Sequence, residues 1–233
     1  EAGQSDPYNT FKTNINGTLN ILEVSRLNNL EKIIVASTAH VYGDNKVPFL
    51  ERYTPKPSRP YETSKACTDL IAQSYADTFS LPVLIPRFVN IYGPGDLNFN
   101  RLIPKTIISV LEKESPRMWG GNAQRDYIYI DDAVDVYIKL GELPGKLMDR
   151  NRIYNFGTGE VISVRKLIEK IIELSGNRFS IEKAEEERSD EITVQYVSSE
   201  KAEKILSFKA KYGLDRGLEK TFNWYKDYFA RQK

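Results

Sequence analysis

The sequence has 233 residues, of which 40% are hydrophobic and 28% are charged, and its formal net charge is +1. These values are typical of a globular protein with one large domain, or one domain and a smaller lobe. The net charge is not that of the many nucleic-acid-binding proteins that are strongly basic. No apolar run approaches the roughly 18 residues that cross a membrane. No signal peptide is apparent. The single cysteine, Cys67, cannot form an intrachain disulfide, so we expect a reducing, cytoplasmic location.

The first part of the chain predicts a helix followed by a buried strand. We expect the helix from about Pro7 to Asn28, because proline suits a first helical turn and apolar residues recur along one face. Residues 32–36 contain a short apolar run, Ile33-Ile34-Val35-Ala36, that is rich in β-branched residues, which is typical of a parallel strand covered on both faces. Ser37 and Thr38 follow directly, at the end of the strand where open α/β sheets bind their ligands.

A second helix is predicted from Glu62 to Phe79, and it begins next to a tyrosine and a lysine. Tyr61 and Lys65 are four residues apart, so they lie on one face, one turn apart. A nearby ammonium favours the phenolate of a tyrosine, whose unperturbed pKa is about 10, and such a tyrosine can accept a proton near neutral pH. Taken alone, the pair does not indicate chemistry, because any amphipathic helix can carry a tyrosine and a lysine at this spacing. With Thr38 at a strand end, it predicts proton transfer around a carbinol carbon.

The rest of the chain alternates predicted strands and helices. A loop rich in proline and charge spans 44–59, residues 93–96 form a turn, and Ser163 caps a helix. Strands are expected at 83–85, 127–130, 152–156 and 179–183, and helices at 102–112, from 131, at 164–175 and at 214–230.

Several motifs follow one another in a specific order. They are Asn14-Ile15-Asn16-Gly17-Thr18, Ser37-Thr38-Ala39-His40-Val41-Tyr42-Gly43, Pro60-Tyr61-Glu62-Thr63-Ser64-Lys65, Pro86-Arg87-Phe88-Val89-Asn90-Ile91-Tyr92-Gly93, and Gln124-Arg125-Asp126-Tyr127-Ile128-Tyr129-Ile130-Asp131-Asp132. Together they resemble the extended short-chain dehydrogenase/reductase family that modifies nucleotide-sugars, from Ala2 almost to the C-terminus. The resemblance implies an α/β fold, a Rossmann-like doubly wound parallel sheet with a smaller α/β substrate-binding lobe. We place the partial Rossmann-type cofactor domain at 1–96 and mainly the substrate lobe at 97–233, with some segments returning to the Rossmann domain.

The resemblance also implies the chemistry, which is hydride transfer between NAD, or NADP, and C4 of a nucleoside-diphosphate sugar. Tyr61 would be the base, Thr38 would hydrogen-bond the same oxygen, and Lys65 would bind the nicotinamide ribose and lower the pKa of Tyr61. Further cofactor contacts are expected from Ser37 and Phe88. The substrate contacts are expected from Asn90, Asn100, Arg125 and Arg188. A surface ion pair between Arg188 and the preceding glutamates would explain this arginine nearly as well. Asn14 would support the site by a polar contact, and a surface asparagine followed by a close-packing glycine at residue 17 is the equally weighted alternative. No metal ligand is expected.

The reaction subtype stays open between a 4-epimerase and a 4,6-dehydratase. The 4,6-dehydratases usually have an acid after the catalytic threonine, where this chain has Ala39. His40 is either a base near neutral pH or a structural residue of the loop. The Ser-Thr-Ala-x-Val-Tyr-Gly motif resembles that of a 4-epimerase, whereas residues 95–101 and 190–202 resemble CDP-glucose 4,6-dehydratases. The base, the sugar and the choice of NAD over NADP are not predicted.

A glycine-rich turn that would hold the pyrophosphate of a dinucleotide does not occur in the sequence, which has neither Gly-x-Gly-x-x-Gly nor Gly-x-x-Gly-x-x-Gly. The chain therefore resembles one without the first part of a Rossmann domain, and we expect it to bind NAD weakly. One alternative function is a catalytically inactive nucleotide-sugar-binding remnant. Another is an interaction subunit, and we expect a homodimer through helices around Leu19-Leu22 and Leu70-Tyr75.

Overall fold

The computed structural model describes residues 2–119, 122–144, 152–183 and 193–232, and divides the chain into two compact units. The first unit comprises Glu1–Val89, Val134–Gly157 and Tyr196–Lys209. The second comprises Asn90–Ala133, Thr158–Gln195 and Ala210–Lys233. The chain therefore leaves the first unit before the predicted border at residue 96. The reason is that strand β4 (Asn90–Tyr92) pairs with β6 (Gln124–Tyr129) in the sheet of the second unit.

The first unit is built on a parallel sheet. Strands β1 (Ile33–Ile34) and β2 (Ser37–Thr38) both pair with β3 (Val83–Phe88), and β7 (Ile153–Phe156) pairs with β3 as well. Ile33 lies opposite Val83 and Ser37 lies opposite Arg87, so β1 and β2 continue in one register as a single interrupted strand. The predicted parallel strand at 32–36 and the predicted α/β class are confirmed.

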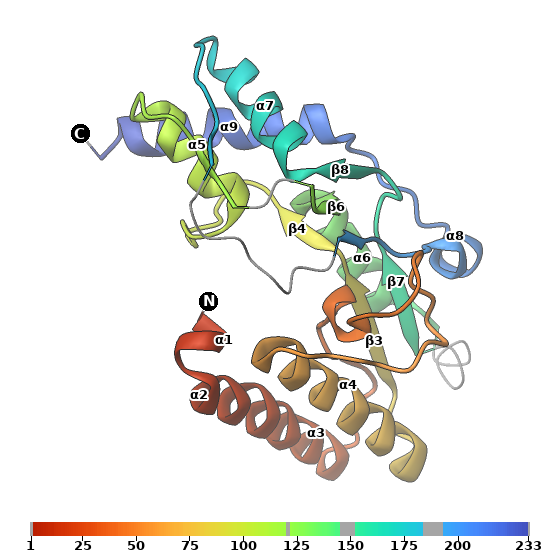
Figure 1. The fold of residues 1–233 in the computed structure, drawn as a ribbon. Coiled ribbons are helices and arrows are strands. Elements are labelled where there is room, and N and C mark those ends of the chain that lie inside the picture. Colours follow the sequence, from red (N-terminus) through yellow and green to blue (C-terminus); the bar gives the residue numbers. More distant parts are fainter. Residues whose placement is uncertain (1, 120–121, 145–151, 184–192, 233) are drawn as a thin grey trace. The chain divides into compact units, whose positions relative to one another are not determined.

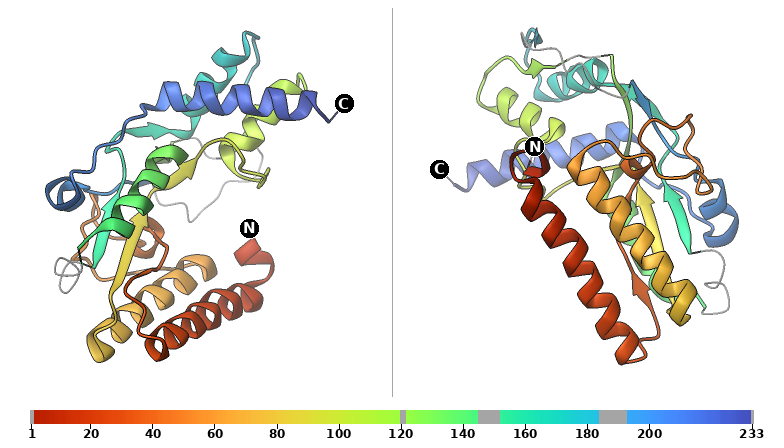
Figure 2. Two further views of the ribbon diagram at one scale, coloured as in Figure 1. Left: turned by 180° about the vertical axis from the view of Figure 1, so that it is seen from behind. Right: turned by 60° about the horizontal axis from the view of Figure 1, so that its bottom comes forward.

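Helices α3 (Gly17–Leu27) and α4 (Pro60–Phe79) run side by side in the first unit (Figures 1 and 2). The predicted helix from Pro7 is one helical path of three pieces, α2 (Pro7–Phe11), a π-helical segment (Lys12–Asn16) and α3. α4 begins with a proline in its first turn, as predicted. Leu22 of α3 packs with Ala72 and Ala76 of α4 over β3, which places the hydrophobic core between these helices and the sheet.

The remaining elements of the first unit are short, apart from the end of one long helix. They are α1 (Ala2–Ser5), a 3₁₀ helix (Ala39–Tyr42) and α8 (Glu200–Leu206). The long helix, α6 (Ile130–Glu142), begins in the second unit and belongs to the first from Val134 onwards.

In its described residues, the second unit combines a mixed sheet with helices α5 (Leu102–Leu111), α7 (Val164–Ser175) and α9 (Leu214–Ala230) and the start of α6. β10 (Val194–Gln195) and β4 pair parallel with β6, whereas β8 (Val161–Ser163) is antiparallel to it. β5 (Arg117–Met118) and β9 (Glu182–Lys183) form a separate pair, so the strand predicted at 179–183 is shorter than expected. Ser163 caps α7, as predicted.

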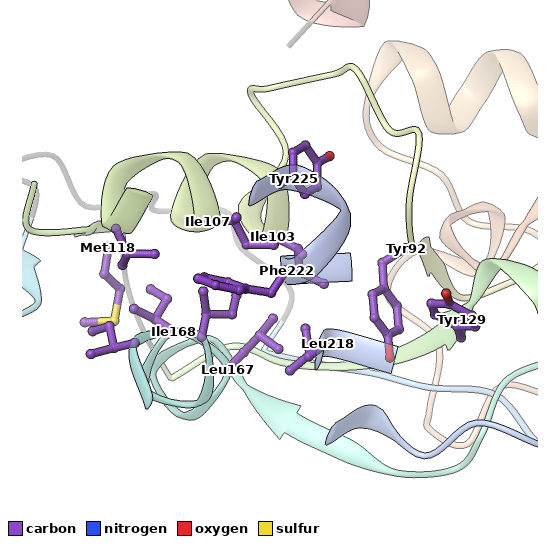
Figure 3. Packing of buried hydrophobic residues seen from close by; sticks show 13 residues of the cluster. Tyr92, Ile103, Ile107, Met118, Tyr129, Leu167, Ile168, Leu218, Phe222 and Tyr225 are labelled. Carbon is purple, nitrogen blue, oxygen red and sulfur yellow. The ribbon is translucent and has the colours of Figure 1, made fainter. Parts of the chain in front are cut away.

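Figure 3 shows the core of the second unit, where Leu218 and Phe222 of α9 meet Leu167 of α7 and Ile107 of α5. These four side chains are buried, and the amphipathic pattern of each helix explains why it packs here. Among the described residues, no helix has both the length and the apolar character needed to cross a membrane.

Candidate functional site

The end of β2 carries two buried hydroxyl groups that point to opposite faces of the sheet. Ser37 lies opposite Arg87 and Thr38 lies opposite Phe88, and successive side chains of a strand alternate between faces. The Thr38 hydroxyl oxygen accepts a hydrogen bond from the backbone N–H of His40 at 3.3 Å, which caps the 3₁₀ helix Ala39–Tyr42. Thr38 is thereby held at the carboxyl end of a parallel strand, the position predicted for a ligand-binding residue.

Tyr61 and Lys65 lie in the first two turns of α4, as predicted. Tyr61 is 47% exposed although it is a large aromatic residue, whereas Lys65 is half-buried. Burial lowers the pKa of Lys65, and the negative charge of Asp69 opposes this shift. The close approach of α1 explains a glycine in this region, since a Cβ on Gly3 would lie 3.0 Å from the Cβ of Tyr61.

Asn14 contacts the start of the same helix. Its Nδ2 donates a hydrogen bond to Ser64 Oγ at 2.9 Å, and Ser64 Oγ donates to the backbone carbonyl of Tyr61 at 2.7 Å. Asn14 itself lies in the π-helical segment, a type of distortion that is frequent at functional sites. The polar contact expected of Asn14 is therefore made to the turn that carries Tyr61.

Asp69 is a buried carboxylate that joins three elements. It accepts hydrogen bonds from Ser37 Oγ at 2.8 Å, and from Arg87 Nε and Nη2 at 2.8 and 2.9 Å. Both partners of the ion pair are almost fully buried, and the charge-assisted bonds offset part of their loss of hydration. The Ser37 hydroxyl, which we predicted to contact the cofactor, is thus bonded to Asp69 inside the first unit.

Phe88 is also more enclosed than expected. It is 2% exposed, and its ring stacks on Phe156 with the centroids 5.1 Å apart and lies 5.5 Å from the ring of Tyr137. The pKa of Tyr137 is raised by burial and by the nearby Tyr61. Sequence analysis missed Tyr137, because one tyrosine in an amphipathic helix is not distinguishable from a core residue.

The described candidates for substrate binding all lie in the second unit. Asn90 Nδ2 donates to the backbone carbonyl of Asp126 at 3.1 Å, which joins β4 to β6. Arg125, on β6, is partly exposed, and its Nη1 donates to the carbonyl of Gln124 at 2.9 Å. Asn100 is exposed and precedes α5. Arg188 lies outside the described residues.

Asp126 is a second buried carboxylate that sequence analysis missed. It accepts hydrogen bonds from the hydroxyl and backbone N–H of Thr158 at 2.6 and 3.2 Å, and from the N–H of Gly159 at 3.0 Å. Gly159 has a φ of 76°, a conformation that favours glycine. Burial raises the pKa of Asp126, and the hydrogen bonds only partly counteract this shift. Asp126 therefore holds the turn next to the strand that carries Arg125.

Comparison with known proteins places these features in a family. Residues 1–157 match the NAD dependent epimerase/dehydratase family. A UDP-glucuronate 4-epimerase of Thermodesulfobacterium geofontis is 28% identical over 232 residues, which cover 97% of this chain and 69% of the relative. A dTDP-D-glucose 4,6-dehydratase of Mus musculus is 32% identical over 236 residues, which cover 94% of this chain and 62% of the relative. The chain thus spans about two thirds of the length of these relatives.

The fold agrees with this result. The crystal structure of the UDP-glucuronic acid 4-epimerase from Bacillus cereus, in complex with UDP-glucuronic acid and NAD, has a TM-score of 0.85 and 25% identity, and 93% of this chain and 68% of that chain are covered. The chain belongs to the NAD dependent epimerase/dehydratase family, whose members act on nucleotide-sugars. The family predicted from the motifs, its Rossmann-type fold and its cofactor NAD are confirmed.

Proposed function

We propose that this protein transiently oxidises C4 of a nucleoside-diphosphate sugar, with Tyr61 as the base. The observation that carries the proposal is the position of Tyr61, which is 47% exposed, one helical turn before the half-buried Lys65. α4 packs against β2, the strand that ends at Thr38. Tyr61, Lys65 and Thr38 thus supply a phenol, an ammonium and a hydroxyl. These are groups that can together remove a proton from a carbinol.

NAD, when bound, supplies reversible removal of a hydride from that carbinol carbon. The residues present fit its nicotinamide and ribose end, because Lys65 is a partly buried cation and Tyr61, one turn before it, is 47% exposed. We propose that Lys65 holds the ribose. Phe88 has little exposed surface, so we propose that it supports this end of the cofactor from behind, through Tyr137 and Phe156.

The proton chemistry falls to the side chains of this chain. Tyr61 takes the proton of the sugar hydroxyl, and the positive charge of Lys65 favours the resulting phenolate. Thr38 donates a hydrogen bond to the same sugar oxygen and keeps it directed at Tyr61. For the substrate, we propose that Arg125 binds the diphosphate, because a guanidinium forms charge-assisted bonds to phosphate oxygens. Asn90, Asn100 and Arg188 are further candidates for this binding.

A catalytically inactive, nucleotide-sugar-binding protein is the second candidate function. The observation that favours it is the absence of a glycine-rich pyrophosphate turn from the sequence. Such a protein would bind nucleotide-sugars through Arg125 but would not turn them over with NAD.

We also propose a homodimer, through the outer faces of α3 and α4. Ile21, Leu27 and Leu70 are 62%, 64% and 52% exposed, an apolar surface that a second copy would cover. Leu22, which we had placed in this interface, is fully buried instead, because it packs with Ala72 inside the unit. A cytoplasmic location fits the single cysteine, Cys67.

The test is a panel of UDP-, dTDP-, GDP- and CDP-hexoses, incubated with the protein and followed by product analysis, with NAD in large excess because the sequence predicts weak NAD binding. We expect one sugar class to be converted. A 4-epimer as the product identifies an epimerase, and a 4-keto-6-deoxy sugar identifies a dehydratase. Tight binding of a nucleotide-sugar with no conversion of any of them would contradict the proposal and favour the inactive binding protein.

A further inference from the structure

The only histidine of the chain lies between two of the candidate catalytic groups. The backbone N–H of His40 donates to the hydroxyl of Thr38 at 3.3 Å, and its ring Nδ1 lies 3.7 Å from Glu62 Oε1. Glu62 follows Tyr61 directly in the first turn of α4. A continuous path of close contacts therefore leads from the Thr38 hydroxyl through His40 and Glu62 to the residue that carries the phenol.

Glu62 is a buried carboxylate, which is unusual for a residue in the first turn of a helix next to an exposed tyrosine. Burial alone would raise its pKa, but the nearby imidazole of His40, the N–H of Ser58 and the charge of Arg59 together outweigh burial, so the pKa of Glu62 is lowered. The Ser58 N–H lies 3.4 Å from Glu62 Oε2. The partners of this carboxylate thus come from the 3₁₀ helix and from the loop before α4.

We propose that the His40–Glu62 pair fixes the Thr38 hydroxyl relative to the Tyr61 phenol, and that both members are positioning residues for proton transfer from the sugar. The inference rests on the proposed function, since it assumes that Thr38 and Tyr61 act on one oxygen. The pair joins the loop after β2 to the first turn of α4, which are the segments that carry these two groups. Small errors in the placement of reacting groups are costly, because a shift of about 1 Å can reduce the rate about 100-fold.

The separation of 3.7 Å between His40 Nδ1 and Glu62 Oε1 is too long for a hydrogen bond but lies within the range of an ion pair. Because the pair joins the segments that carry Thr38 and Tyr61, we expect the rate of sugar oxidation, and not only stability, to depend on it.

The test is a double-mutant cycle with His40→Gln, Glu62→Gln and the double variant. Each is assayed for kcat and KM with the best sugar of the panel, and for unfolding in urea. We expect each single change to lower kcat about tenfold with little change in KM, and the double variant to lose no more than one single variant, because the two residues act as a unit.

Glu200→Gln is the matched control, since Glu200 pairs with Lys204 on the exposed face of α8 and has no contact with the pair. Its kcat and KM should equal those of the wild type. An unchanged kcat in all three variants would mean that the pair is only a structural contact, and would overturn the proposal. The proposal would also be overturned if the losses in unfolding free energy of the two single variants added up in the double variant. If the wild-type protein converts no sugar of the panel, the proposed function itself fails. In that case the unfolding free energies of the variants still show whether His40 and Glu62 interact, but the positioning role is withdrawn.

Discussion

Tyr61 and Tyr42 show how differently two tyrosines of neighbouring motifs are used. Tyr61 leaves its phenol exposed, whereas Tyr42 is fully buried, donates to Asn155 Oδ1 at 2.8 Å and lies under the guanidinium of Arg87. Burial raises the pKa of Tyr42 to about 12, so that its phenol stays neutral where an exposed one ionises. Burial thus assigns Tyr42 to structure, whereas Tyr61 is 47% exposed.

Tyr42→Phe tests the buried phenol. We expect the variant to be destabilised by about 1–3 kcal/mol, because the Asn155 amide oxygen loses its partner. The folded pKa of Tyr42 is raised above the unfolded value near 10, so this group makes the wild-type stability fall as the pH rises from about 10 to about 12. Urea unfolding across this range should show a shallower fall in the variant. Tyr8→Phe, at an exposed tyrosine, should follow the wild type. Equal slopes for wild type and Tyr42→Phe would contradict the assignment.

Arg125→Ala tests the proposed diphosphate contact. Calorimetric titration with the preferred nucleotide-sugar should show binding weakened by about 1.5–3 kcal/mol, because one charge-assisted bond is lost. NAD binding should change much less. Arg117→Ala is the control, since Arg117 is an exposed arginine of the same unit, paired with Glu182. Equal affinities for the two variants would mean that Arg125 is an ordinary surface residue.

Side chains that act through local spacing could be predicted from the sequence, and those that act through distant partners could not. Tyr61, Lys65 and Thr38 could be proposed from the sequence because a one-turn spacing and a strand end are local signals, and the helix and the strand end that carry them are observed. Asp69, Asp126 and Glu62 were missed, since a buried carboxylate is identified only by partners far away in the chain. Ser37 shows the same limit, because its distant partner Asp69 is not visible in the motif.

α4 contains two aspartates in different environments. Asp69 is buried and bonded to Arg87, whereas Asp77 is largely exposed and pairs with Arg152 at 2.6 Å. The same substitution at both sites therefore separates a buried from an exposed ion pair on one helix.

Asp69→Asn is expected to destabilise the protein by about 3–5 kcal/mol, because it leaves the Arg87 guanidinium buried without a countercharge. Asp77→Asn, the matched control, should cost less than about 1 kcal/mol. Urea unfolding monitored by circular dichroism measures both. Similar losses for the two variants would show that the Asp69–Arg87 pair is not the connection between α4 and β3 that the structure describes.

At the scale of the elements, long periodic helices and the buried strand could be predicted from the sequence. α4, α7 and α9 were expected close to their observed bounds, because helical periodicity is a local signal. The short strands β5, β8 and β10 were missed. Strands of two or three residues exist only through pairing with distant partners, which a single sequence does not reveal.

At the scale of the whole molecule, the chain passes repeatedly between the two units. We expected some segments beyond residue 96 to return, but the sequence does not show that Val134–Gly157 and Tyr196–Lys209 are those segments. Their return depends on β7 pairing with β3 and on α8 packing against β7.

The proposed dimer is tested by placing a charge on its apolar surface. Ile21→Glu or Leu70→Glu should convert the dimer to a monomer in sedimentation experiments, because a carboxylate would be buried without a partner. Val134→Glu is the control, since Val134 is an exposed apolar residue of α6, outside the proposed interface. A dimer that survives both interface changes, or one that Val134→Glu disrupts instead, would place the contact elsewhere.

Reduction of NAD in a single turnover, compared between the wild type and Tyr61→Phe, is the most direct test of the central claim. The sugar is the one that the panel selects, and the signal is the absorbance of the reduced nicotinamide. The account predicts that Tyr61→Phe slows this step at least about 100-fold, because the base that accepts the sugar proton is removed, while circular dichroism and nucleotide-sugar affinity stay those of the wild type. Tyr8→Phe should leave the rate unchanged. Reduction at the wild-type rate in Tyr61→Phe would contradict the account.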